Sequence, residues 1–135
     1  MTMTTAEVAR RYQEAMNSKD REAQMALFAY DAVYTAGGPA RGSRYEGKAA
    51  ISGAMDRAMF KVFEVSKLEV EEIIVAKDHF FVPINVVGKS RITGRPYANK
   101  LLLMETVKDG KIVHQHEYLD TIASARATGD IPYPD

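Results

Sequence analysis

Apolar residues recur at helical spacing in the first part of the chain. Thr4 and Glu7 have the spacing of a capping box, in which a threonine hydroxyl and a glutamate carboxylate bond each other's backbone amides where a helix starts. The apolar positions that follow predict a first helix that continues to Met16. Asp20 is a suitable cap for a second helix, which the pattern carries through Phe28.

A broad apolar stripe between Gly47 and Val62 predicts a third helix. Met55 and Met59 lie on this stripe. A flexible thioether fills irregular gaps in a core, and it can equally line an adaptable pocket for an apolar small molecule. Both methionines are therefore candidate pocket residues as well as candidate core residues.

The second half of the chain has the alternation of strands, separated by connections of hairpin length. The last connection contains Asp109-Gly110, a dipeptide that favours the positive φ angles of a tight hairpin turn. Three helices followed by sequential strands predict an α+β fold, with a mostly antiparallel sheet and the helices gathered on one face. The tail from Ile122 is rich in small and turn residues and is expected to be irregular. The predicted strands are 67–76, 79–89, 98–107 and 111–120, with a shorter one at 32–35.

The last strand carries the most chemistry. Strict alternation places His114, His116, Tyr118 and Asp120 on one face together with Ile112. Imidazoles, a phenol and a carboxylate that line a cavity are suited to acid/base catalysis, whereas the same groups on a surface strand need no role beyond solubility. A register slip of one residue would turn all of them away from the cavity together.

Composition excludes several classes of protein. The 135 residues predict one domain, 1–135, and the absence of cysteine excludes disulfides, thiolate nucleophiles and Cys-based zinc sites. Lysine plus arginine, 18, equals aspartate plus glutamate, 18, so neither nucleic acid nor an anionic membrane is an expected partner. No apolar run approaches the ~20 residues of a membrane span, and the N-terminal sequence lacks signal-peptide character, so a cytoplasmic protein is expected. The paired histidines have no third ligand at a recognisable spacing, so no metal is expected.

Four short segments stand in a recognisable order along the chain. They are Arg11-Tyr12-Gln13-Glu14-Ala15-Met16-Asn17, Leu27-Phe28-Ala29-Tyr30-Asp31-Ala32, Tyr45-Glu46-Gly47-Lys48-Ala49-Ala50-Ile51, and Asp109 to Val113 leading to Glu117-Tyr118-Leu119-Asp120. In this order they resemble the nuclear-transport-factor-2-like superfamily, which includes ketosteroid isomerases, limonene-type epoxide hydrolases and SnoaL-type polyketide cyclases. The resemblance implies a cone-shaped fold, with a curved sheet wrapped around an apolar pocket.

The resemblance also implies site residues. Asp120 falls where epoxide hydrolases and SnoaL-type cyclases place a catalytic aspartate, and Tyr12 matches the first-helix tyrosine of the isomerase oxyanion hole. The isomerase base would fall near Ala36 and its second oxyanion donor near Leu102, neither of which can serve. The remaining epoxide hydrolase residues would fall near Val87 and Lys89, which argues against that reaction as well.

By analogy with pockets of this superfamily, alternate residues of the predicted strands 79–89 and 98–107 are expected to face inward. These residues are expected to bind substrate beside Tyr118. The expected inward residues are Asn85, Val87, Lys100, Leu102 and Met104.

The residues that alternate with these are expected on the opposite face of the sheet. There Leu101, Leu103 and Val113 form an apolar face, which predicts a homodimer through the sheet.

The leading hypothesis is a cofactor-independent cyclase or isomerase that acts on an apolar, oxygenated carbonyl compound of polyketide or terpenoid type. Asp120 would move the proton, while Tyr12, His116 or Asn85 stabilises negative charge on oxygen. One alternative is a non-catalytic ligand-binding or assembly protein with the same fold. A second alternative is a hydrolase similar to the epoxide hydrolases.

Overall fold

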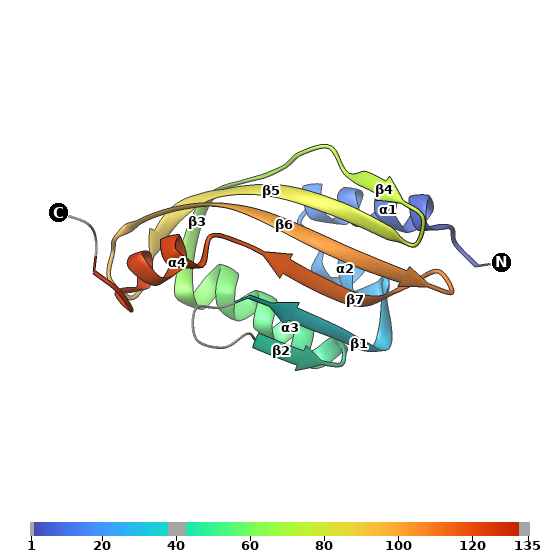
Figure 1. The fold of residues 1–135 in the computed structure, drawn as a ribbon, viewed down its shortest axis with the longest axis horizontal. Helices are drawn as coiled ribbons and strands as arrows, with labels where there is room; N and C mark the ends of the chain where they lie inside the picture. The colour runs from blue at the N-terminus through green and yellow to red at the C-terminus, as the bar shows by residue number, and fades with distance from the viewer. Residues whose placement is uncertain (1, 38–42, 133–135) are drawn as a thin grey trace.

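A computed structural model describes residues 2–37 and 43–132, except for the side chain of Met59. Helices and strands follow one another along an elongated molecule, with the start of α1 and helix α4 towards its opposite ends (Figure 1). The helices are α1 (Thr5–Asn17), α2 (Arg21–Ala26), α3 (Lys48–Asp56), the π-helix η1 (Arg57–Val62) and α4 (Thr121–Thr128). The strands are β1 (Phe28–Ala36), β2 (Ser43–Glu46), β3 (Phe63–Val70), β4 (Ile74–Ala76), β5 (His79–Ser90), β6 (Pro96–Lys108) and β7 (Lys111–Tyr118).

The strands form one curved, open sheet, which confirms the α+β class. The strand order is β2-β1-β7-β6-β5-β3, and β4 pairs with the first residues of β5. The central hairpins are antiparallel as predicted, but β1 runs parallel to β7, so the sheet is mixed. β1 belongs to the first half of the chain and joins the sheet beside its last strand, so a long connection separates the two parallel strands.

The helix predictions are partly right. The capping box of Thr4 and Glu7 is present at the start of α1. The second helix ends at Ala26 rather than Phe28, because the carbonyl of Leu27 accepts a 2.8 Å bond from the Ile112 amide and the chain enters β1. The third helix passes from α3 into the π-helix η1. The described residues contain a fourth α-helix, α4, in the tail that was expected to be irregular.

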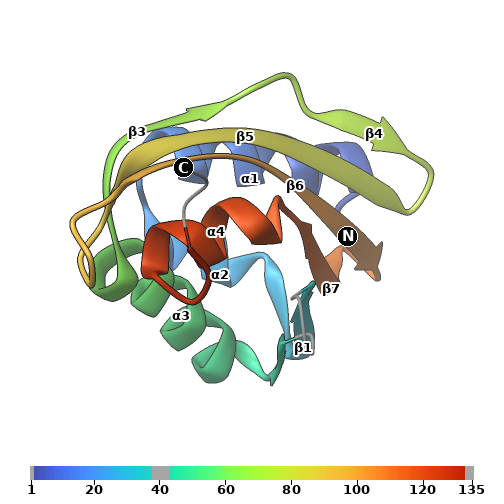
Figure 2. The same cartoon turned by 60° about the vertical axis from the view of Figure 1, so that its left-hand side comes forward.

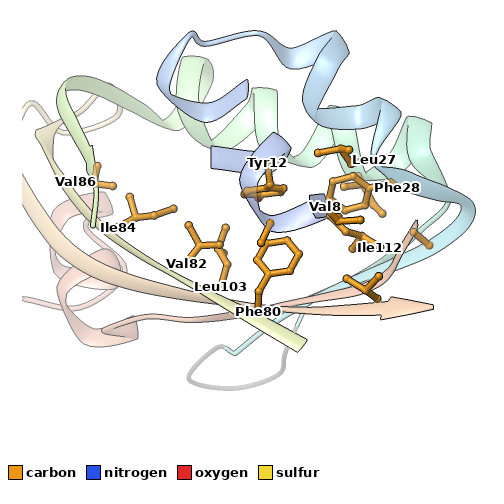
Figure 3. Close-up of a cluster of buried hydrophobic side chains, with 14 of the residues drawn as sticks. Val8, Tyr12, Leu27, Phe28, Phe80, Val82, Ile84, Val86, Leu103 and Ile112 are labelled. Atoms are coloured by element: carbon orange, nitrogen blue, oxygen red, sulfur yellow. The ribbon is translucent and has the colours of Figure 1, made fainter. Parts of the chain in front are cut away.

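The helices lie under the concave side of the sheet, with α2, α3 and α4 visible beneath the arch of β5 and β6 (Figure 2). Phe80, Val82, Ile84 and Val86 on β5 point into this space and are almost fully buried. Tyr12 descends from α1 onto Phe80, with ring centroids 5.5 Å apart in an edge-on arrangement (Figure 3). Burying each such side chain contributes roughly 1.5–3 kcal/mol, so this face of the sheet forms the core.

A β-bulge in β7 decides which side chains enter that core. Thr106 pairs with His114, yet the next residue, Val107, pairs with Ile112, so Val113 is an extra residue in β7. The two residues that flank the bulge on the inner side are Ile112 and Gln115, both buried. The extra residue reverses the alternation that the sequence predicted from Ile112 onward.

Candidate functional site

A cavity of about 390 Å³ lies between the helices and the concave face of the sheet. Its walls come from α1, α2, the α3–η1 segment and β3, and its floor from β5, β6 and β7. Most of its lining is apolar, including Leu68, Ile84, Leu101 and Leu103. Polar and charged side chains, among them Arg21, Asp56, Lys67 and Glu117, also line the cavity, and they fix what chemistry is available to a bound small molecule.

The carboxyl group of Glu117, on β7, is the acidic group at the floor of the cavity. Its Oε2 accepts a 2.7 Å hydrogen bond from the Tyr34 hydroxyl on β1. Burial raises the pKa of the Glu117 carboxyl, and the bond from Tyr34 opposes this shift. Burial, and then the neighbouring Glu117 charge, raises the pKa of Tyr34, so the phenol stays protonated and acts as a donor.

A directional chain of hydrogen bonds ends beside this carboxyl group. Gln24 Nε2 donates to the Tyr12 hydroxyl at 3.1 Å, and that hydroxyl donates to Gln115 Oε1 at 2.9 Å. Gln115 is 1 % exposed and lines the cavity, and its Nε2 has no hydrogen-bond partner among the described residues. Because Tyr12 occupies the amide oxygen, the amide nitrogen of Gln115 remains available to an oxygen of a bound molecule.

A second carboxyl group, that of Glu105, is fully buried behind this chain. Glu105 pairs across the sheet with Gln115 and Phe80, and neither carboxyl oxygen has a hydrogen-bond partner among the described residues. Burial raises the pKa of Glu105 well above its ordinary value. Burial, and then the Glu105 charge, raises the pKa of Tyr12. Glu105 does not line the cavity, so it influences the site through its neighbours.

The sequence prediction for the inward faces of the strands is wrong. The lining of the cavity comes from the opposite parity, Leu101, Leu103, Gln115 and Glu117, because of the bulge at Val113 and the burial of the even-numbered residues of β5. The residues expected inward that instead lie on the outer parity of the sheet, outside the cavity lining, are Asn85, Val87, Lys100, Leu102, Met104, His116 and Tyr118.

The outer-face residues have partners of their own. Asn85 donates a 2.8 Å hydrogen bond to Glu71, and Val87 and Tyr118 are 45 % and 50 % exposed. His114 and His116 both bond the hydroxyl of Thr35 on β1. The edge of the Tyr118 ring packs on His116, with centroids 4.4 Å apart.

Asp120 lies at the end of β7 and caps α4. Its Oδ1 accepts a 3.0 Å hydrogen bond from the Ala123 amide, and its side chain is exposed rather than part of the cavity lining. Asn99 holds its backbone, donating to the Asp120 carbonyl at 3.0 Å and accepting from the Asp120 amide at 3.1 Å. Capping of α4 accounts for this geometry.

Two predicted pocket residues, Tyr12 and Met55, do line the cavity, whereas the side chain of Met59 lies outside the described structure. Sequence reasoning missed Tyr34, Gln115 and Glu117. The sequence of β5 does indicate which of its faces points inward. Every even position from Phe80 to Val86 is apolar, while the odd positions include proline and asparagine.

A second hollow, of about 520 Å³, lies between β1, β2 and the start of α3. It is open to solvent, and two of its charged residues, Arg44 and Glu46, pair with each other at 2.9 Å. The part of the chain that the structure describes has no helix long and apolar enough to span a membrane.

Residues 9–115 match the family model of the SnoaL-like domain. No match was found among curated proteins. Among solved structures, an NTF2-like protein from Burkholderia xenovorans LB400 is 25 % identical, with coverage of 95 % of this chain and 98 % of that one and a TM-score of 0.77. An NTF2-like protein from Burkholderia thailandensis E264 is 22 % identical, with coverage of 96 % and 99 % and a TM-score of 0.82. A proposed SnoaL-like polyketide cyclase from Mesorhizobium loti is 26 % identical, with coverage of 86 % and 99 % and a TM-score of 0.73.

Proposed function

The chain belongs to the SnoaL-like family, and we propose that Glu117 is its catalytic base. Membership in this family suggests a small-molecule cyclase or isomerase. The substrate is an apolar, oxygenated carbonyl compound, of the polyketide or terpenoid type. The observation that carries the proposal is the Glu117 carboxyl group in an apolar cavity, bonded to Tyr34 at 2.7 Å.

Glu117 takes a proton from the carbon next to the substrate carbonyl and returns it at another carbon. Alternatively, the enolate attacks a second carbonyl carbon, and Glu117 returns the proton to the oxygen of that carbonyl. Burial raises the pKa of the Glu117 carboxyl, and a carboxylate with a raised pKa is a stronger base than a solvated one. Tyr34 stays bonded to the carboxylate and holds it in one orientation. The chemistry requires proton transfer only, so the proposal needs no cofactor.

Gln115 supplies the complementary donor. Its Nε2, buried and without a partner among the described residues, donates to the substrate oxygen as that oxygen gains negative charge. Tyr12 serves as the residue that fixes the amide, since its hydroxyl donates to Gln115 Oε1. This differs from the oxyanion role that the resemblance implied for Tyr12.

The proposal moves the catalytic carboxylate from Asp120 to Glu117, and parallel variants test the two against each other. Apolar ketones and β-dicarbonyl compounds are screened by NMR for exchange of the proton next to the carbonyl with solvent deuterium. For a compound that exchanges, Glu117→Gln is expected to lower the exchange rate about 10³-fold, because general-base catalysis contributes typically 10²–10⁴-fold. Ligand affinity should change little, since the amide has the shape of the carboxyl group.

Glu72→Gln removes an exposed carboxylate outside the cavity lining and is the matched control, expected to retain full exchange activity. Full exchange activity in Glu117→Gln, together with its loss in Asp120→Asn, would return the role to Asp120. A cavity that binds apolar carbonyl compounds in the wild-type protein but exchanges none of their protons would favour the non-catalytic binding protein.

The homodimer through the sheet remains a proposal, but different residues now support it. Leu101 and Leu103, which suggested it, line the cavity instead, while the outer face presents the exposed side chains of Val87 and Tyr118. Such a face gains by contact with a second copy. Light scattering in solution should give twice the chain mass, and a monomeric mass at high concentration would remove the proposal.

A further inference from the structure

Two imidazoles on the outer face of the sheet point at a single oxygen atom. His114 Nε2 lies 2.7 Å and His116 Nδ1 2.6 Å from Thr35 Oγ1. A hydroxyl group has one proton, so it donates to only one of the two rings, and the other ring donates to it through its own N–H. Two ring nitrogens from alternate residues of β7 thus already converge on one point.

We propose that this point is a binding site for a divalent first-row transition-metal ion, with His114 Nε2 and His116 Nδ1 as its ligands. Imidazole suits Cu²⁺, Ni²⁺ and Zn²⁺. Metal–nitrogen bonds are about 2.0–2.1 Å, so an ion between the two rings requires the Thr35 side chain to rotate its hydroxyl away and each nitrogen to move inward by roughly half an ångström or slightly more. Rotation of the rings supplies this movement, because both histidines are only partly buried.

One charged neighbour bears on the binding of a cation at this point. The positive charge of Arg44 opposes a cation, but Arg44 Nε bonds Glu46 at 2.9 Å, which offsets part of that charge. The Tyr118 ring packs on His116, with ring centroids 4.4 Å apart.

The remaining coordination positions belong to solvent. Within residues 2–37 and 43–132, no group of three or more His, Asp or Glu side chains is placed to hold an ion, so the described residues contribute two imidazoles. Affinity for a site of this kind rises along the first-row series to Cu²⁺, which makes Cu²⁺ the most sensitive probe. The site lies on the face opposite the cavity, so its existence is independent of the role of Glu117.

The chain contains three histidines, which allows a complete set of single variants. Cu²⁺ is titrated calorimetrically into the wild-type protein and into His114→Ala, His116→Ala and His79→Ala. The wild type should bind one ion per chain, and the first two variants should bind it at least tenfold more weakly. His79, which starts β5 and pairs with Thr106, is the matched control and should leave the affinity within twofold. Electron paramagnetic resonance of the bound ion should show coupling to two imidazole nitrogens.

A measurement on the unaltered protein covers any variant that fails to fold. Substoichiometric Cu²⁺ should broaden the ring proton signals of His114 and His116 before those of His79. Equal broadening of all three rings, or a wild-type affinity no greater than that of the double variant His114→Ala/His116→Ala, would overturn the proposal.

Discussion

The two faces of β7 carry similar polar side chains in different surroundings. On the inner face, Gln115 and Glu117 lie under the helices with apolar neighbours. On the outer face, His114, His116 and Tyr118 are partly exposed and bonded to or packed on one another. One strand therefore presents two chemistries, and a single extra residue, Val113, decides which set enters the cavity.

The difference lies in burial as well as in residue type. Burial raises the pKa of Glu117, and Gln115 Nε2 has no hydrogen-bond partner among the described residues. The outer histidines each bond Thr35 Oγ1 through one ring nitrogen and have solvent nearby. A binding partner for the outer face must therefore displace an existing hydrogen bond, whereas a ligand in the cavity need not.

The largest change that we predict on the inner face follows from removing the hydroxyl of Tyr34. In Tyr34→Phe, Glu117 loses its charge-assisted hydrogen bond, which is worth about 1.5–3 kcal/mol to the ionised form. The pKa of Glu117 should rise further, because the bond opposes the effect of burial. The side-chain carboxyl carbon of Glu117, followed by NMR against pH and assigned with Glu117→Gln, gives the midpoint.

The rate of proton exchange should follow the same titration. A base acts only when deprotonated, so the exchange rate rises with pH through the pKa of Glu117, and in Tyr34→Phe this rise should occur at higher pH. Tyr45→Phe is the matched control, since the Tyr45 ring packs edge-on against Tyr34 at 5.8 Å without bonding Glu117. A midpoint for Glu117 that is unchanged in Tyr34→Phe would show that the bond at 2.7 Å does not stabilise the carboxylate.

Much of the fold could be predicted because it rests on local signals. The capping box at Thr4, the hairpin turn at Asp109-Gly110 and the alternation of β5 each depend on a few adjacent residues. The parallel pairing of β1 with β7 could not be predicted in this way, since it joins segments about eighty residues apart. Helix α4 was missed because its short, small-residue sequence has little helical pattern, although Asp120 and Gly129 are good caps.

The site was harder to predict than the fold because it depends on register. On β6, Leu101, Leu102, Leu103 and Met104 are all apolar, so alternation does not say which of them faces inward. The bulge at Val113 has no clear signature in the sequence, and it reverses every inference drawn outward from Ile112. Tyr12 was placed correctly because its helix has one apolar face and no such ambiguity.

The next largest effect concerns the cost of burying a carboxyl group on the inner face. The pKa of Glu105 is raised by burial, so the folded state holds its proton more tightly than the unfolded chain does. The free energy of unfolding must then fall as pH rises from about 4.3 towards the raised pKa. Glu105→Gln removes this titration and should be about 1–3 kcal/mol more stable than the wild type near pH 7, with little difference near pH 4.

Denaturant unfolding at several pH values measures this difference. Glu69→Gln is the outer-face control, because Glu69 is half exposed in an ion pair with Lys67 at 3.3 Å, and such pairs contribute little. Its stability should follow the wild type at every pH. If the free energy of unfolding of Glu105→Gln had the same pH dependence as that of the wild type, Glu105 would not take up a proton on folding. Burial would then not raise the pKa of this inner-face carboxyl group.

The smallest effect separates capping from catalysis at the end of β7. Asp120→Ala removes the side chain that accepts the Ala123 amide at the start of α4, which should cost about 1 kcal/mol of stability. Asp20 caps α2 in the same way, accepting from the Ala23 amide at 2.9 Å, so Asp20→Ala should cost a similar amount. Both variants should keep their proton-exchange activity at temperatures where they are folded. A loss of more than tenfold in Asp120→Ala alone would show that Asp120 does more than cap α4, because two caps of equal strength would then differ only in their effect on the cavity.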